Sequence, residues 1–142
     1  MHTTLGPVLA LALWSLIMLG WMVARRFPAM KAKGVKLAGM RGGRGQDLER
    51  VTDDPSIHWP AHNYTHLMEQ PTLFYAVALA LFVMGAGSGW SAWLAWAYVG
   101  VRVAHSIVQS TSNIVSVRFA FFAASTLVLI VMIARAFTTL LR

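Results

Sequence analysis

The chain has 142 residues, of which 57% are hydrophobic and 12% are charged, and it carries a net charge of +7 and no cysteine. An ordinary soluble domain contains about 25% charged residues, so this composition excludes one and predicts a small integral membrane protein. The absence of cysteine excludes disulfides, a thiolate metal site and a cysteine nucleophile.

The first predicted transmembrane helix covers residues 5–24, which are almost entirely apolar. About 20 such residues span a bilayer core of roughly 30 Å. No Lys or Arg precedes this segment, and Arg25 and Arg26 follow it in place of a small-residue cleavage site. We therefore predict an uncleaved helix and not a signal peptide.

Residues 25–59 form a long, polar and basic connection. It holds eight of the twelve Lys and Arg residues, namely Arg25, Arg26, Lys31, Lys33, Lys36, Arg41, Arg44 and Arg50. This clustering follows the positive-inside rule and predicts a cytoplasmic loop near anionic headgroups. The loop explains the net charge, so nucleic-acid binding is not expected. Within it, residues 46–51 favour a short helical turn.

Three further transmembrane helices are predicted at residues 60–84, 90–110 and 118–137. The glycine-rich residues 85–89 predict a tight turn, which makes the second and third helices antiparallel neighbours. Tryptophans at the start of the third helix indicate an interfacial aromatic belt. The predicted fold is all-α, a single up-down-up-down four-helix membrane bundle with both termini outside and the basic loop cytoplasmic.

Ionisable side chains interrupt the second apolar segment, where lipid makes them costly. His62, His66 and Glu69 follow one another at spacings of four and three, so they share one helical face. On the third helix, Tyr98, Arg102, His105 and Gln109 share a face for the same reason. Because the two helices are antiparallel, Glu69 and Arg102 reach similar depths, and we predict an ion pair between them.

These positions together predict one polar pocket that opens to the cytoplasmic interface. Its lining is expected to be His62, His66, Glu69, Arg102, His105, Gln109 and Arg118, with Arg25 and Arg26 at the mouth. A structural role is also open for each of them. The ion pair can fix helix register, the histidines can be hydrogen-bonded core residues, and the arginines can be interfacial or topogenic anchors.

Three short runs carry a resemblance to a known family. They are His66-Leu67-Met68-Glu69-Gln70-Pro71, similar to an Asn-x-x-Glu-x-x-Pro-like signature, then Thr72-Leu73-Phe74-Tyr75, and Arg102-Val103-Ala104-His105. With them the chain resembles the MAPEG family, the membrane-associated proteins in eicosanoid and glutathione metabolism, and in particular its short bacterial members. The resemblance covers nearly the whole chain.

The resemblance implies a homotrimer in the bacterial inner membrane, with a glutathione site between adjacent subunits. It implies a transferase or peroxidase that joins glutathione, or another small thiol, to lipophilic electrophiles. Arg118 would stabilise the thiolate. The implied glutathione-binding residues are His62, His66, Glu69, Arg102, His105, Gln109, Arg25 and Arg26. Where the family pattern has Arg, Asn and Tyr, this chain has His62, His66 and Gln109.

Other functions remain open from the residues alone. A non-catalytic membrane scaffold or lipid-binding protein would keep the fold and use Glu69 and Arg102 structurally. A haem held by His66 and His105 would make the protein coloured. A small multidrug exporter is similar in size, but such exporters carry an essential glutamate in the first helix, and residues 5–24 contain no acid.

Overall fold

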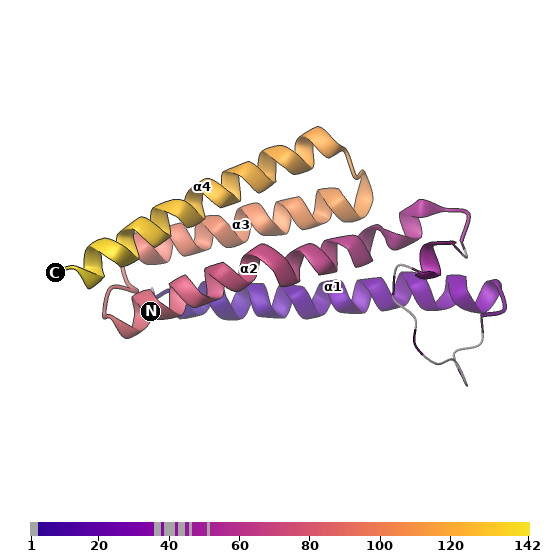
Figure 1. Cartoon of the computed structure of the whole chain (residues 1–142), viewed down its shortest axis with the longest axis horizontal. Helices are drawn as coiled ribbons and strands as arrows, with labels where there is room; N and C mark the ends of the chain where they lie inside the picture. The colour runs from indigo at the N-terminus through magenta and orange to yellow at the C-terminus, as the bar shows by residue number, and fades with distance from the viewer. Residues whose placement is uncertain (1–2, 36–37, 39–41, 43–44, 46, 51) are drawn as a thin grey trace.

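The computed structural model describes residues 3–35, 38, 42, 45, 47–50 and 52–142. It contains four α-helices, α1 (Leu5–Ala32), α2 (Trp59–Val83), α3 (Trp90–Thr111) and α4 (Val115–Leu140). Two short 3-10 helices, η1 (Asp47–Arg50) and η2 (Pro55–His58), lie between α1 and α2. The helices alternate in direction, with both termini at one end and the long α1–α2 connection at the other (Figure 1). The predicted all-α four-helix bundle is confirmed.

The helices extend beyond the predicted apolar segments. Helix α1 continues past residue 24 through Arg25, Arg26 and Pro28 to Ala32, because most residues in this stretch are good helix formers. Helix α4 begins at Val115 and not at residue 118. Three of the predicted loop cations, Lys36, Arg41 and Arg44, lie outside the described residues. The predicted turn at 46–51 appears as η1, its end residues also lying outside the described part.

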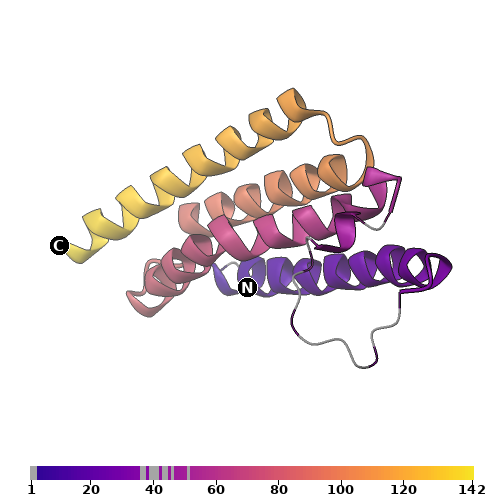
Figure 2. The same ribbon diagram turned by 45° about the vertical axis from the view of Figure 1, so that its right-hand side comes forward.

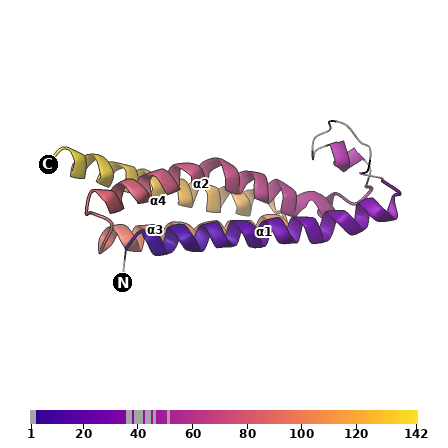
Figure 3. The same cartoon turned by 90° about the horizontal axis from the view of Figure 1, so that it is seen from below.

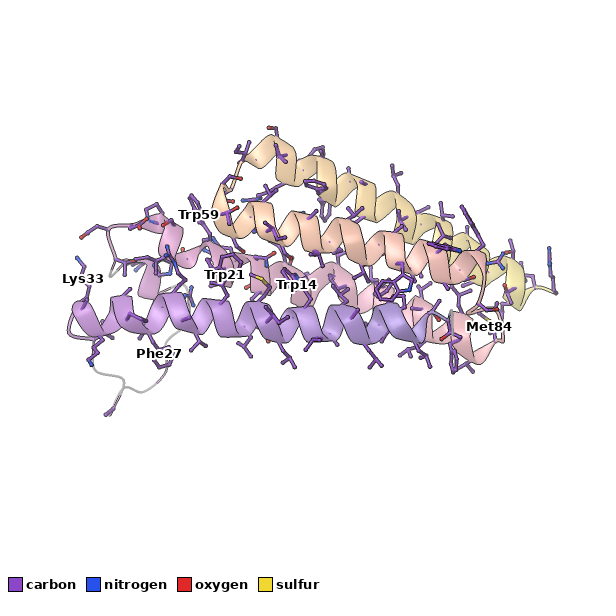
Figure 4. All side chains as sticks on the ribbon, turned by 180° about the vertical axis from the view of Figure 1, so that it is seen from behind. Trp14, Trp21, Phe27, Lys33, Trp59 and Met84 are labelled. Carbon is purple, nitrogen blue, oxygen red and sulfur yellow. The ribbon has the colours of Figure 1, made fainter. Side chains whose placement is uncertain are left out.

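The bundle consists of two tightly packed helix pairs, α1 with α2 and α3 with α4, joined by contacts between α2 and α3. Figure 2 shows α4 beside α3 and far from α1. Trp14 and Trp21 point from α1 toward the other helices, whereas Phe27 points away from them (Figure 4). In the core, the rings of Phe74 and Tyr98 stack with centroids 4.4 Å apart.

Three helical segments, α1, residues Pro55–Val83 and α4, are long and apolar enough to cross a membrane. Helix α3 falls outside that group because polar residues interrupt its sequence. These residues face inward, since Arg102, His105 and Gln109 are buried, while Trp93 and Ile107 are exposed. Helix α3 therefore places its polar side chains in the interior of the bundle and presents an apolar outer face.

Thr4, near the start of the chain, makes hydrogen bonds to the end of α2 and to the turn between α2 and α3. The Thr4 backbone N–H donates to the Gly87 carbonyl at 2.8 Å, and the Thr4 hydroxyl donates to the Ala78 carbonyl at 2.7 Å. A Cβ added at Gly87 would lie 2.8 Å from the Phe82 Cα and 3.0 Å from the Thr4 Oγ1. The Phe82 backbone atom is the harder of the two to displace, so this turn requires glycine at position 87.

Gly87→Ala is expected to lower the free energy of unfolding by about 1–3 kcal/mol, the usual cost of forcing an extra methyl group into a packed site. The matched control is Gly100→Ala on α3, where an added Cβ meets no atom within 4 Å. This control is expected to stabilise the helix by about 0.5–1 kcal/mol. Unfolding in mixed micelles measures both, and equal effects of the two substitutions would contradict the close approach at Gly87.

Candidate functional site

The ionisable stripe of α2 lies on the outer surface of the bundle. The side chains of His62, His66 and Glu69 are 43%, 42% and 58% exposed. The buried face of the same helix carries Asn63 and Leu67. The predicted spacing was right, but the prediction that this face points inward was wrong. Periodicity shows which residues share a face and does not show which way that face points.

In place of the predicted ion pair with Glu69, Arg102 makes two hydrogen bonds to neutral groups. Its Nη2 donates to the His66 carbonyl at 2.9 Å, and its Nη1 donates to the Gln70 Oε1 at 3.3 Å. Glu69 instead contacts His66, with 3.0 Å between its Oε2 and the histidine Nδ1. The predicted depth was correct. The partner differs because neighbouring residues of a helix point about 100° apart.

Gln70 joins three helices, and the sequence analysis missed it. Its Oε1 also accepts from the Ser125 hydroxyl at 3.3 Å, while its Nε2 donates to the Thr126 hydroxyl at 2.7 Å. Gln70 thus connects α2 to Arg102 on α3 and to two residues on α4. Its position as an amide between Glu69 and Pro71, at the start of the apolar part of α2, was the available signal.

The predicted polar face of α3 is buried behind the α2 stripe. Arg102, His105 and Gln109 are at most 5% exposed. Among them, His105 Nε2 lies 3.0 Å from the Gln109 Oε1, and the His105 ring lies edge-on to the His66 ring at 6.2 Å. His66 therefore links the exposed stripe to this buried network.

Arg118 lies in the first turns of α4, where the sequence placed it. Its Nη1 donates to the Asn113 side-chain oxygen in the α3–α4 turn, while its Nε is buried without a partner. Asn113 has a φ of 53°, which asparagine tolerates better than most residues. The turn thus orients a half-buried cation that keeps one N–H free.

The two arginines at the predicted mouth differ in position. Arg25 is exposed, and its Nη2 donates to the Ser56 hydroxyl at 3.4 Å, beside η2. Arg26 is half-buried, and its Nη2 lies 3.8 Å from the Glu49 Oε1. The predicted role at a pocket mouth therefore fits Arg26 better than Arg25.

A pocket of about 510 Å³ lies between the second half of α1 and the first turns of α2. Figure 3 shows these two helix segments side by side at the end of the bundle that carries the α1–α2 connection. Ligand pockets commonly measure about 300–1,000 Å³. It is lined by Met22, Arg26, Gly45, Glu49, Ala61, His62, Tyr64, Thr65 and His66. Of the predicted lining it contains Arg26, His62 and His66. The structure thus separates the predicted single pocket into this pocket and the buried network behind His66.

The histidines show no arrangement typical of a metal site. Within the part of the chain that the structure describes, no group of three or more His, Asp or Glu residues is placed to hold a metal ion. His66 contacts Glu69 and His105 contacts Gln109 through one ring nitrogen each. Both histidines therefore already have polar partners within the chain, and nothing in their contacts favours the haem hypothesis.

Comparison with known proteins gives one positive result. The family model described as MAPEG family matches residues 4–138, which include all of α1, α2 and α3 and most of α4. Searches among curated proteins and solved structures gave no match. The matched range contains every residue of the α2 stripe, the buried network and the pocket.

Proposed function

This chain belongs to the MAPEG family and is an integral membrane protein, and we propose that it activates glutathione or another small thiol for attack on lipophilic electrophiles or peroxides. The observation that carries the proposal is the exposed α2 stripe, backed by a buried cation. His62, His66 and Glu69 lie on the surface of a membrane bundle, with Arg102 hydrogen-bonded directly behind them.

An exposed carboxylate on a membrane helix is costly unless polar groups, rather than lipid, surround it. Placing a charge in lipid costs about 2.5–3.5 kcal/mol on insertion scales. Among the described residues, Glu69 has only the partly exposed His66 as its ion-pair partner. A second copy of the chain, packed on this face, would exclude lipid and complete a polar site between subunits. This argument supports the homotrimer with an intersubunit thiol site that the family resemblance implies.

Arg118 is the proposed thiolate-stabilising residue. A cation about 4 Å from a sulfur anion contributes roughly 4 kcal/mol at an effective dielectric constant of 20. One pKa unit corresponds to about 1.4 kcal/mol, so a reduction of about two units from the usual thiol pKa of 8.5 is reasonable. The thiol proton passes to solvent, and the thiolate forms a C–S bond to the electrophilic carbon as the leaving group departs with its electron pair. With a peroxide, the thiolate forms an S–O bond as the O–O bond breaks and an alcohol leaves. A second thiol then converts the sulfenic acid to a disulfide and water.

The remaining polar residues would bind and orient the donor. Arg26 and His62 line the pocket and supply N–H donors for peptide carboxylates. His66 and Glu69 would contact the polar backbone of the thiol compound. Arg102 is a positioning residue, because its guanidinium holds the His66 carbonyl and is itself buried. His105 and Gln109 would act through the same buried network.

Glutathione is expected to raise the unfolding temperature of the purified protein, and Arg26→Ala is expected to weaken its binding by about tenfold, the loss of one charge-assisted hydrogen bond. The neighbouring Arg25→Ala is the matched control, because Arg25 contacts Ser56 outside the pocket. Thermal-shift titration gives both affinities. The ultraviolet absorbance of bound glutathione against pH reports the thiolate.

An intact oligomer that gives no thermal shift and no thiolate signal with glutathione would contradict this function. That result would favour the non-catalytic scaffold. Equal losses of binding in Arg25→Ala and Arg26→Ala would keep the function and contradict the proposed pocket.

A further inference from the structure

The pocket beside α2 already contains a carboxylate from the chain itself. Glu49 lies on η1, a four-residue helix in the α1–α2 connection. Its Oε1 is 2.8 Å from the His62 Nε2 and 3.8 Å from the Arg26 Nη2. All three side chains line the pocket. A carboxylate held between an arginine and an imidazole is the arrangement that a bound ligand carboxylate would adopt.

The loop approaches Arg26 closely at a second point. A Cβ added at Gly45 would lie 2.9 Å from the Arg26 Nη1, so the backbone at this position passes close to the guanidinium. The Arg26 Nε is buried and has no hydrogen-bond partner among the described residues. The guanidinium is therefore covered by the loop without being fully hydrogen-bonded, and it keeps a donor for an incoming anion.

The electrostatics of Glu49 agree with an anion site. The hydrogen bond from His62 holds the pKa of this carboxyl below its usual range, burial opposes that effect, and the charges of His62, His58 and Arg26 add to the lowering. The site therefore favours a negative charge at the position of the Glu49 carboxylate. Glu49 is itself one-third exposed, which leaves it free to be displaced.

We propose that Glu49 is an internal occupant of an anion site formed by Arg26 and His62, and that a ligand carboxylate takes its place when η1 moves away. The identity of the ligand rests on the proposed function, whereas the displaceable contact itself does not. Only molecules in which the site is open bind the ligand, so the apparent affinity equals the intrinsic affinity multiplied by the fraction of open molecules. Glu49 thus acts as an autoinhibitory contact at the mouth of the pocket.

Glu49→Gln tests this inference, because it keeps the shape of the side chain and removes its charge. A partly exposed charged pair contributes up to about 1 kcal/mol, so affinity for S-methylglutathione is expected to rise roughly three- to fivefold. Asp53→Asn is the matched control. It removes the same charge from the same loop, but Asp53 contacts Lys33 and not Arg26 or His62. Its affinity is expected to equal that of the unaltered chain.

Hydrogen exchange gives a readout that does not need the ligand. The peptide containing η1 is expected to exchange faster in Glu49→Gln than in the unaltered protein, and at an unchanged rate in Asp53→Asn. If the η1 peptide exchanges hydrogen at the same rate in Glu49→Gln as in the unaltered protein, the proposed contact of Glu49 with Arg26 and His62 is contradicted. If the unaltered chain binds S-methylglutathione and Glu49→Gln binds it equally or more weakly, the proposed displacement of Glu49 by a ligand carboxylate is contradicted. Failure of both proteins to bind S-methylglutathione contradicts the proposed function alone, and exchange then decides on the contact.

Discussion

Arg118→Ala is expected to lower kcat/KM for a thiol-dependent conjugation by about 10²-fold at pH 7, the usual effect of removing one fixed electrostatic group from an active site. Arg118 is held by Asn113, and its Nε–H has no partner among the described residues. A chlorodinitrobenzene-type electrophile with glutathione provides the assay. Arg118→Lys keeps the charge without the planar fork and is expected to lose less activity.

The pH profile separates thiolate stabilisation from simple orientation. A thiol pKa of about 6.5 in place of 8.5 gives roughly 25 times more thiolate at pH 7, although lower intrinsic nucleophilicity offsets about eightfold of that gain. The acid limb of the profile is therefore expected to move upward by about two units in Arg118→Ala. Above about pH 9, where the thiolate forms unaided, the deficit should shrink to the part due to orientation.

Asn113→Gly is the matched control for the structural role of Arg118. Glycine accepts the positive φ of this turn, and the substitution removes only the contact with the guanidinium. A modest loss of activity without a shift of the acid limb is expected. A rate deficit in Arg118→Ala that stays constant across the whole pH range would contradict the role of Arg118 in lowering the thiol pKa.

The α2 stripe shows how far sequence reasoning reaches in a membrane bundle. In soluble proteins the apolar face of a helix points toward the core, so a polar stripe on the opposite face is predicted to be exposed to solvent. Lipid is as apolar as the core, and this rule no longer orients the helix. The spacing of His62, His66 and Glu69 was therefore correct, while their exposure required the structure. An outward stripe is also what an intersubunit site needs.

The loop shows a different limit of sequence analysis. The four helices and the shared face of Arg102, His105 and Gln109 on α3 follow from hydropathy and spacing, because their pattern repeats along each helix. Glu49 reaches His62 across 13 positions in sequence, through a connection without regular repeats. Nothing in the pattern of residues 25–59 distinguishes Glu49 from Asp53 or Asp54. Only the folded chain shows which of these carboxylates lies against Arg26.

Gln70→Leu is expected to destabilise the bundle by about 3 kcal/mol, the upper end of the usual range for losing a hydrogen bond to a charged group. Arg102 is 2% exposed and has no carboxylate within ion-pair distance among the described residues. Its two hydrogen bonds go to Gln70 and to the His66 carbonyl. Removing Gln70 also leaves Thr126 without the bond from the Gln70 amide.

Arg102→Met is expected to change stability by less than about 1 kcal/mol, because it removes the desolvated cation and leaves no polar group unpaired. Gln70 keeps its contacts with Ser125 and Thr126, and the His66 carbonyl keeps its helical bond. The double substitution Arg102→Met/Gln70→Leu should therefore be more stable than Gln70→Leu alone, by about 2 kcal/mol in unfolding titrations. If Arg102→Met lowers the free energy of unfolding more than Gln70→Leu does, the guanidinium contributes to the stability of the bundle. The expected order instead indicates that the fold tolerates this buried arginine and does not depend on it for stability.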